Sequence, residues 1–438
     1  MTGPPNVRAV SLREAMAYAE KQNPDLRSAQ ARVQAARAAA GVPSAQWLPS
    51  VGATAQILGS TVNNSTATFL SNPRVDLPRI GATNIRAEPD FKPYASTLVA
   101  VGVRQEIFDF GRIAAQTAAL DAQTDLERQR AEGAKLDVAL QVTEAYWAVR
   151  AAKAVAEAAD EAATRASAHR DAARAGVEAG LRTPVDLARA EAEVARFEVA
   201  KVRAEGALAA AQAVFAAVVG VPDEALDAGD PAGDEDPSAS LEDLLERARG
   251  SSAEVREALA RVELSKAETR AAAAQMRPDI FLTAAISGRA GGAPPSSGTT
   301  VGGHGLAPLV PNWDVGVVLS VPLYDPVLAA RRDALRAVEE VRKAELGATR
   351  AAQAAVVRQA YLGLVATRQA LGALDRAAAA ARANHEQAEA RFKAGLGTML
   401  ELVDAEALRV EAEVERAVGG FEAARARARL LRAVAEVR

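Results

Sequence analysis

The sequence predicts a mainly α-helical fold with a smaller β portion, in which one set of elements occurs twice. Three observations lead to this fold class. Long tracts rich in alanine, glutamate and arginine favour helices. Four shorter segments alternate apolar and polar residues, as strands do, and similar landmarks recur in the same order about 215 residues later. Because alanine fills little volume and only 4% of the residues are aromatic, thin walls of helices fit this composition better than a thick globular core.

The duplication is clearest where two helical tracts are interrupted by nearly the same short sequence. Residues 179–187 read "AGLRTPVDL" and residues 394–402 read "AGLGTMLEL". The same offset aligns Tyr146, in "VTEAYWAVR", with Tyr361, in "VRQAYLGLV". Further upstream, "EIFDFG" aligns with "VPLYDP" and "WLPSVGATAQILG" with "MRPDIFLTAAISG". Four landmarks in one order indicate a duplication rather than a chance similarity.

Each repeat is expected to hold a first helix, two strands, a very long helix and a shorter helix. The expected helices are Leu12–Ala40, Arg112–Val177 and Val185–Val219, and then Ala253–Gln275, Leu328–Lys393 and Leu400–Val437. The acidic stretch "VPDEALDAGDPAGDEDPSAS" between the repeats reads as a loop or linker. The predicted division is 1–220 for the first repeat, 221–250 for the acidic inter-repeat (equatorial) segment and 251–438 for the second repeat. Two apolar stripes on the long helix predict neighbours on both sides, whereas an isolated coiled-coil hairpin would have one dominant stripe.

The four strand segments separate apolar residues from polar ones. In "LVAVGVRQEIF" one face carries Val99, Val101, Val103 and Ile107, and the other carries Ala100, Gly102, Arg104 and Glu106. The segment "WDVGVVLSVPLY" alternates in the same way, as do "IFLTAAISG" and, more weakly, "VGATAQILG". A small soluble sheet packed on helices would give this pattern. So would membrane strands, because about ten residues span a tilted bilayer crossing and Arg104, Glu106 and Asp314 suit a wet lumen.

A membrane location for these strands would require association of several chains. Strands in lipid must form a closed barrel, and four strands are too few to close one. Three copies of the chain would supply twelve strands. The polar and apolar faces alone leave the soluble sheet and the membrane barrel both open.

Several classes of function find no support in the sequence. The net charge is −4 and there is no basic stripe, which argues against a nucleic-acid partner, and there is no cysteine for disulfides or thiolate metal sites. His169, His304 and His385 lack metal-ligand spacing and are expected on the solvated surface. We find no nucleophile, base or phosphate-binding loop, so we expect neither an enzyme nor a cofactor.

Targeting and surface signals are equally sparse. The first residues show no signal-peptide pattern. No run of about 18 apolar residues predicts a transmembrane helix, the nearest candidate being Ala207–Val219. The Gly-rich stretch "GGAPPSSGTTVGGHG" lacks the end of a phosphate loop and reads as an extracellular loop. Asn63–Thr66 fits a glycosylation pattern that is common by chance.

By the order of its parts, the sequence resembles the TolC-like outer membrane factor (outer membrane efflux protein) family of Gram-negative bacteria. The resemblance covers nearly the whole chain, and "VRQEIFDFG", "QVTEAYWAVRAAK", "AGVEAGLRTPVDLARAEAEV" and "ARFKAGLGTMLELVDAEALRVEAE" carry it. It implies a homotrimer with a twelve-stranded β-barrel among outer membrane lipids and a long periplasmic α-helical barrel. Such a channel is the passive exit duct of a tripartite efflux pump or type I secretion system and works with a periplasmic adaptor (membrane fusion) protein and an inner-membrane transporter. The alternative function is a soluble periplasmic coiled-coil scaffold.

The resemblance also assigns roles to the two interrupted stretches. They would be helix-to-helix turns at the periplasmic tips, where the adaptor docks: Gly180, Leu181, Arg182, Thr183, Pro184, Gly395, Leu396, Gly397, Thr398 and Met399. The residues themselves predict a left-handed glycine after each long helix, a threonine cap before each next helix and a proline in the first turn of one of them. A turn without a docking role remains the alternative.

The same comparison implies a periplasmic gate at Glu401, Asp404 and Asp186. In a trimer, acidic residues at a constriction would form rings of carboxylates that attract cations. An ordinary solvated helix face is the alternative. Phe392 and Gly397 stand where some members of the family have a tyrosine and an arginine that latch neighbouring helices. A latch of those side chains cannot form here, so closure must depend on other contacts.

Overall fold

The computed structural model describes residues 8–60, 93–229, 240–290, 307 and 310–435. By their contacts the residues fall into two units, each of which draws on both sequence repeats. The helical unit comprises Met1–Val33, Glu127–Leu259 and Ala344–Arg438, and the sheet unit comprises Gln34–Leu126 and Ala260–Lys343. The two units describe packing, and the division 1–220, 221–250 and 251–438 stays a prediction about the duplicated sequence.

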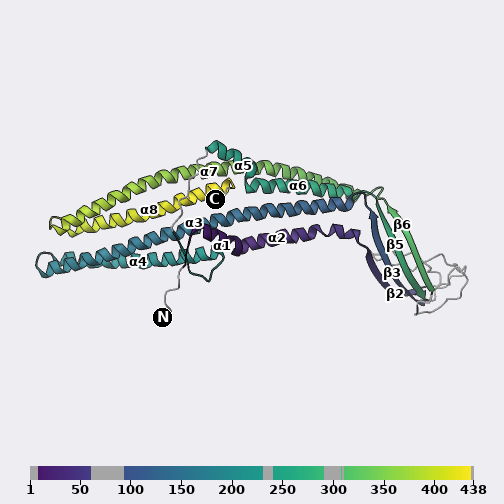
Figure 1. Ribbon diagram of the computed structural model, residues 1–438, viewed down its shortest axis with the longest axis horizontal. Coiled ribbons are helices and arrows are strands. Elements are labelled where there is room, and N and C mark those ends of the chain that lie inside the picture. Colours follow the sequence, from purple (N-terminus) through teal and green to yellow (C-terminus); the bar gives the residue numbers. More distant parts are fainter. Residues whose placement is uncertain (1–7, 61–92, 230–239, 291–306, 308–309, 436–438) are drawn as a thin grey trace. The chain divides into compact units, whose positions relative to one another are not determined.

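Two long helices and two shorter ones dominate the structure, close to the predicted bounds. They are α3 (Arg112–Glu178, 67 residues), α4 (Pro184–Val219), α7 (Pro326–Lys393, 68 residues) and α8 (Met399–Ala433). Figure 1 shows α3 and α4 as one hairpin and α7 and α8 as another. At 1.5 Å per residue, each long helix extends for roughly 100 Å. The predicted helix 253–275 is α6 (Ala253–Ala274).

The helix expected over Leu12–Ala40 is in fact two helices, so this prediction is wrong at its centre. Helix α1 (Leu12–Gln22) ends at Asn23, which is extended, and α2 (Pro24–Ala40) begins directly after it. Pro24 cannot donate a backbone hydrogen bond, which interrupts the helical ladder. The side-chain oxygen of Asn23 accepts from the backbone N–H of Asp25 at 2.9 Å and of Leu26 at 3.3 Å, and so caps the second helix. A short 3₁₀ turn, η1 (Pro43–Trp47), follows α2.

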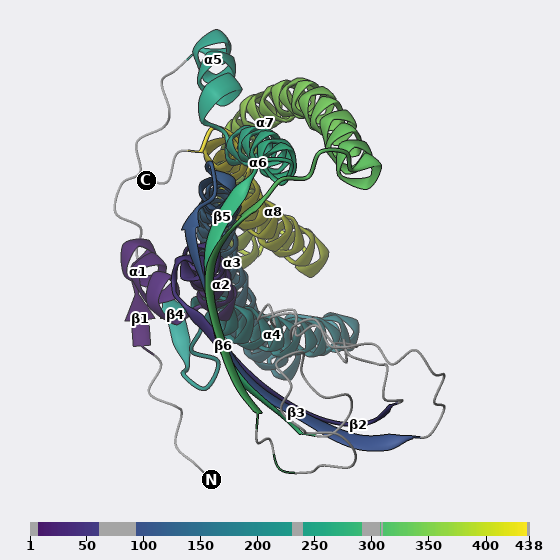
Figure 2. The ribbon, with the colours of Figure 1, turned by 90° about the vertical axis from the view of Figure 1, so that its right-hand side faces the viewer.

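All four predicted strands are present and form one antiparallel sheet. They are β2 (Ser50–Ser60), β3 (Tyr94–Phe108), β5 (Asp279–Ala290) and β6 (Val310–Ser320), in the order β2-β3-β5-β6. Figure 2 shows how strongly this sheet curves. The two repeats meet where β3 pairs with β5, for example Val101 with Ile286, and a bulge interrupts this pairing between Glu106 and Phe108.

The apolar face of this sheet is exposed. Of the two arrangements that the alternation of residues leaves open, this is the one expected for membrane strands. Ile57 is 77% exposed and Trp313 is 73% exposed. Other exposed apolar residues on the sheet are Val51, Val99, Val101, Ile286, Val315, Val317 and Leu319. Polar side chains lie instead on the face that the curvature shelters, among them Gln56, Glu106, Thr283 and Ser287. A soluble sheet packed on helices would show the reverse distribution.

The main core of the helical unit contains a small parallel sheet that the sequence pattern does not predict. Strand β1 (Arg8–Val10) pairs with β4 (Leu226–Ala228), which lies within the stretch expected to be an acidic linker. Tyr146 is fully buried beside Phe215, and its hydroxyl donates to the backbone oxygen of Gly229 at 2.7 Å. Three-residue strands give too short an alternation to be recognised in a sequence. Helix α5 (Leu241–Ser251) follows, and residues 230–239 lie outside the described part of the chain.

Helix α4 is, within the described residues, the one helix long and apolar enough to cross a membrane by length and composition. The run of apolar residues in the sequence predicts no such helix. One such helix is weak evidence of a membrane span, because a core helix passes the same test. Its apolar end has a local explanation, since Phe215, Ala216 and Val219 belong to the core cluster around Tyr146.

We predict that Gly220→Ala destabilises the helical unit. Gly220 ends α4 at φ 91°, and an added Cβ would lie 2.7 Å from the backbone carbon of Gln22. Left-handed strain and a clash with backbone should together cost about 2–4 kcal/mol. The matched control is Gly206→Ala in the same helix, where nothing lies within 4 Å and where alanine should stabilise by about 1 kcal/mol. The midpoint of helix loss on heating, followed by circular dichroism, should fall for the first variant and not for the second.

Candidate functional site

The two interrupted stretches form the same turn at the ends of α3 and α7. Gly180 and Gly395 are left-handed, with φ of 68° and 73°. In the first turn, the N–H of Leu181 donates to the oxygen of Gly176 at 2.8 Å and that of Gly180 to Val177 at 3.0 Å. In the second turn, the N–H groups of Leu396 and Gly395 donate to Arg391 at 2.9 Å and Phe392 at 3.1 Å. This pair of bonds is the Schellman motif that a glycine after a helix permits, so the predicted turn geometry is confirmed.

The helices that follow the turns begin with identical caps. Thr183 caps α4 and Thr398 caps α8, as predicted, and Pro184 is the first residue of α4. In both cases the third residue of the helix completes a capping box: the carboxylates of Asp186 and Glu401 accept from the N–H of their threonines at 3.1 and 3.3 Å. Such reciprocal bonds satisfy backbone donors at the start of a helix.

The predicted tip residues divide into exposed and packed side chains. Leu181 and Leu396, at equivalent places in the two repeats, are 83% and 76% exposed. Met399 is buried in an apolar cluster with Ala173, Ala190, Phe392 and Leu402. Met399 therefore holds the tips together and offers little surface to a partner. Gly397 also lies against the chain, because an added Cβ would be 3.2 Å from Arg391 and Phe392.

Arg182 joins the tip of the first repeat to the tip of the second. Its guanidinium carbon lies 3.7 Å from the ring centroid of Phe392, and its Nη2 donates to the backbone oxygen of Phe392 at 3.4 Å. The stem of Arg182 also covers Gly176. A cation stacked on an aromatic ring contributes about 0.5–2 kcal/mol. The two tips are thus latched through Phe392 by an arginine of the other repeat.

The three carboxylates predicted at the gate have different surroundings. Asp186 and Glu401 are engaged in the capping boxes. The hydrogen bonds from the hydroxyl and the backbone of Thr183 lower the pKa of Asp186 below its ordinary value. Asp404, about one turn further along α8, is exposed and makes no hydrogen bond or ion pair with the part of the chain that the structure describes. Glu401 is exposed as well, so what distinguishes Asp404 among the three is that its carboxylate has no hydrogen-bond or ion-pair partner among the described residues.

One of the three histidines contradicts the prediction of a solvated surface role. His385 on α7 is only 2% exposed, as is Glu406 on α8, and its Nδ1 lies 3.1 Å from the Oε2 of Glu406. His169 on α3 is partly buried, and its ring centroid is 6.5 Å from that of His385. The described residues contain no group of three or more metal-ligating side chains. His304 lies outside the described residues.

The sheltered face of the sheet carries the predicted polar residues. Arg104 lies 3.6 Å from the carboxylate of Asp279 and stacks 3.6 Å from the ring centroid of Phe281. Glu106 accepts from Arg112 at 3.2 Å. The charged residues Arg104, Glu106, Arg112 and Asp279 line an open cavity of about 740 Å³ in the sheet unit. A face of paired charges beside such a cavity suits a water-filled lumen.

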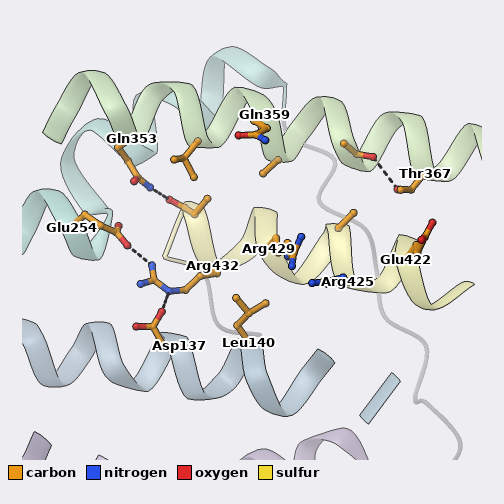
Figure 3. A pocket seen from close by; sticks show the side chains of 15 residues that line it. Asp137, Leu140, Glu254, Gln353, Gln359, Thr367, Glu422, Arg425, Arg429 and Arg432 are labelled. Carbon is orange, nitrogen blue, oxygen red and sulfur yellow. Dashed lines mark hydrogen bonds and ion pairs between the residues drawn. The ribbon is translucent and has the colours of Figure 1, made fainter. Parts of the chain in front are cut away.

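A second cavity, of about 720 Å³, lies in the helical unit between α3, α6, α7 and α8. Figure 3 shows Arg432 between Asp137 of α3 and Glu254 of α6, at 2.7 and 2.8 Å. The other two arginines of this cavity, Arg425 and Arg429, both donate to the Oε1 of Glu144 at 3.0 Å. Every guanidinium in the cavity is therefore paired with a carboxylate. These ion pairs join α8 of the second repeat to α3 of the first.

Some of these site residues could have been found from the sequence. The pattern Thr-x-x-Asp/Glu at Thr183 and Thr398 is a capping-box signature. On α7, Ala378, Ala381, His385 and Phe392 are spaced as a core stripe, which places His385 inside. The Arg182–Phe392 contact carries no such signal, because it joins residues 210 positions apart. The proposed extracellular loop and the Asn63–Thr66 pattern lie outside the described residues.

Comparisons with known proteins agree with this architecture. A family model described as "outer membrane efflux protein" matches residues 16–221 and 244–436. No match to a curated protein is found. The solved structures that resemble the chain include CusC, with 15% identity, 100% of this chain and 95% of that chain covered, and a TM-score of 0.74. The outer-membrane channel OprN has 20% identity, 97% and 90% coverage and a TM-score of 0.70, and VceC of Vibrio cholerae has 19%, 97%, 96% and 0.71.

At these identities the solved structures establish the fold alone. The family match is independent of them and covers most of the chain in both repeats. The chain therefore belongs to the outer membrane efflux protein family, and it is an outer membrane efflux channel with a helical periplasmic extension.

Proposed function

We propose that three copies of this chain assemble into a passive exit duct that opens at its periplasmic tips when an adaptor and an inner-membrane transporter engage it. The observation that carries this proposal is the exposed apolar face of the four-stranded sheet, whose outer strands β2 and β6 each pair with one neighbour. Lipid can cover the apolar face, but a strand edge in lipid needs a partner strand. Three copies would supply twelve strands and leave no edge. A soluble coiled-coil scaffold has no use for such a face.

Exposed aromatic residues support a membrane boundary at the base of the sheet. Trp47, Phe108, Phe110 and Tyr324 are all exposed where the strands give way to helices, and Phe108 packs edge-on against Phe110 with ring centroids 4.7 Å apart. Aromatic side chains favour the interface between lipid and water. In the proposed barrel they would mark its periplasmic rim.

Exposed valines on the helices support side-by-side packing of the copies. On α4 these are Val185, Val199, Val202 and Val214, and on α7 they are Val327, Val338, Val341 and Val356. Their spacing places several on one stripe of each helix. In the proposed trimer, helices of a neighbouring copy would cover these stripes and close a wall of helices around the lumen.

The tips are the proposed docking site for the adaptor. Each chain has two turns of nearly the same geometry, and each turn presents one exposed leucine, Leu181 or Leu396. A trimer would therefore offer six similar docking points. The positions Arg182, Thr183, Pro184, Gly397, Thr398 and Met399 would shape these points through the latch, the caps and the apolar cluster.

The gate is proposed at the start of α8. Asp404 would supply a ring of three carboxylates near the axis, and Glu401 and Asp186 would hold the adjacent helix starts through their capping boxes. A narrow ring of carboxylates attracts cations and disfavours anions. The latch between Arg182 and Phe392 would keep the two tips of one chain together in the closed entrance. We infer no catalytic step and no cofactor.

The first prediction concerns assembly. The mass of the folded complex in mild detergent should equal three chains, because one chain leaves two sheet edges unpaired. Mass photometry or native mass spectrometry can measure it. A folded monomer would contradict the trimer, and a trimer that stays soluble without detergent would contradict the membrane barrel.

The second prediction concerns docking. Replacing Leu181 and Leu396 together by glutamate should weaken adaptor binding at least tenfold, since each exposed apolar side chain buried on binding contributes about 1.5–3 kcal/mol. The trimer should still assemble, because both side chains are exposed. The matched control replaces both by methionine, which keeps the apolar surface. Adaptor affinity, measured by surface plasmon resonance, that is equal for the two variants would remove the leucines from the docking site.

The third prediction concerns the gate. Asp404→Asn should abolish block by divalent cations and reduce cation selectivity in single-channel recordings, because the ring loses its charge. Glu401→Gln is the control: it removes a charge only three residues away while an amide can still accept from Thr398. Equal divalent block in wild type and Asp404→Asn would show that Asp404 does not line the constriction.

A further inference from the structure

A layer of charged and polar side chains crosses the helical unit between two apolar clusters. The tip-side cluster consists of Ala173, Ala190, Phe392, Met399 and Leu402. The second cluster consists of Ala162, Ala163, Ala166, Val194 and Phe197. Between the two clusters lie His169 of α3, His385 of α7 and Glu406 of α8, and Arg165 of α3 stands beside them among the residues of the second cluster. The layer therefore joins the α3–α4 hairpin of the first repeat to the α7–α8 hairpin of the second.

Glu406 is the centre of this layer. Its Oε1 accepts from the Nε of Arg165 at 2.9 Å, and its Oε2 lies 3.1 Å from the Nδ1 of His385. Arg165 also donates to Glu161 at 3.0 Å. Burying a carboxylate this deeply requires a partner, and Arg165 supplies it from the other repeat. Separating the hairpins would leave Glu406 without that partner.

The layer is incompletely hydrogen-bonded. The Nη2 of Arg165, the Nδ1 of His385 and the Oε2 of Glu406 are buried and make no hydrogen bond within the described residues, although the last two atoms are close. A buried polar atom without a partner costs about 1–3 kcal/mol. Apolar side chains in the same places would pack these helices at lower cost. Stability alone therefore does not account for the layer, and buried polar contacts of this kind are best known for setting register or a switch.

His169 is the side chain of this layer whose burial opposes a positive charge. Burial lowers the pKa of His169, Glu406 and Glu389 oppose that effect, and His385 and Lys393 add to it. It stands four residues after Arg165 on one helix, where like charges repel. The charged and titratable groups around the layer are Glu161 and Arg165 on α3, Glu193 and Arg196 on α4, His385, Glu389 and Lys393 on α7, and Asp404, Glu406 and Arg409 on α8.

The direction of the pH effect follows from proton linkage. With a pKa below the ordinary 6.5, His169 binds a proton less readily in packed hairpins than in separated ones. The packed form therefore loses stability as pH falls from about 6.5 toward the lowered pKa of His169. Glu193 has the opposite sign, because burial raises its pKa above 4.5 and acid relieves the cost of burying its charge. Its effect lies closer to pH 4.5, so the destabilising window begins just below pH 6.5.

We propose that His169 is a proton sensor that weakens the Arg165–Glu406–His385 link and so loosens the α7–α8 hairpin from α3 in mild acid. A proton on His169 places a cation near His385, whose ring centroid is 6.5 Å away, and one helical turn from Arg165, in a layer with one central carboxylate. The consequence for the periplasmic entrance rests on the proposed gate, because α8 carries both Glu406 and Asp404. The loosening itself is a property of the helical unit and does not depend on transport.

Hydrogen exchange of the detergent-solubilised complex tests the link directly. Peptides from residues 384–410 are followed by mass spectrometry at about pH 7.5 and about pH 5.5, on either side of the ordinary histidine pKa, with labelling times scaled to the intrinsic exchange rate. In wild type the protection of this hairpin should fall in acid, because His169 binds a proton less readily in the packed form than in the separated one. His169→Gln, which cannot take up the proton, should keep its protection. His169→Arg, with a permanent charge, should have low protection at both pH values.

His304→Gln is the matched control, because it removes a histidine from elsewhere in the chain and should behave as wild type. The proposal is overturned if wild-type protection does not fall, if His169→Gln falls as far as wild type, or if His304→Gln removes the effect. If His169→Arg fails to assemble, the comparison of wild type with His169→Gln still decides. Single-channel recordings that contradict the Asp404 gate would leave the exchange result in force, so the two failures can be told apart.

Discussion

The need to pair every strand edge is the constraint on which the structure depends. Backbone groups in lipid have no water to bond with, so each strand must have a neighbour on both sides. Within one chain this holds for β3 and β5, which pair with each other across the two repeats and with β2 and β6 on their other sides. The chain leaves β2 and β6 at the two edges. Apolar side chains on the exposed face add a second demand, which lipid can meet but water cannot. In the proposed barrel, assembly would thus be a condition of the fold and not an addition to it.

The helices are limited in a different way, because their many alanines bury little area where two helices pack. Several contacts between helices are made by alanines alone, as in the cluster of Ala378, Ala381 and Ala412. Such contacts allow close approach but bury little area, at about 25 cal/mol per Å². A wall of this kind has weak preferences for register. Polar contacts between the repeats then specify which parts of α3 face which parts of α8: the pairs of Arg432 with Asp137 and of Arg165 with Glu406.

Elements with long, regular patterns could be predicted from the sequence, and those fixed by single contacts could not. The long helices and all four membrane strands lie close to their expected bounds because each has many residues in one pattern. The glycine turns and threonine caps were also predictable, since local geometry decides them. The break at Asn23 was missed although Pro24 is visible in the sequence, because the alanine-rich pattern continues on both sides. Strands β1 and β4 are held by tertiary contacts around Tyr146 and leave no pattern of their own.

At the site, the sequence identified the correct turns but not what joins them. Because Phe392 and Gly397 stand where some family members have a tyrosine and an arginine, the sequence predicts that the latch of those two side chains cannot form. The structure places Arg182 on Phe392 instead. At the repeat offset, Arg182 corresponds to Gly397 and Phe392 corresponds to Val177. These equivalents cannot make the same contact. The duplicated tips have therefore diverged into complementary partners, one supplying the cation and the other the ring.

The buried layer shows the same divergence. Arg165, His385 and Glu406 correspond at the repeat offset to Ala380, Arg170 and Glu191. Glu191 is exposed and pairs with Arg174 at 3.3 Å, so the equivalent position in the first repeat carries a surface ion pair of little energetic weight. The two hairpins thus recognise each other as unlike surfaces, despite their common origin. In a ring built from three such chains, this asymmetry would distinguish contacts within a chain from contacts between chains. An entrance that opens by moving one hairpin of each chain needs that distinction, because six identical contacts would give no single place for the movement to begin.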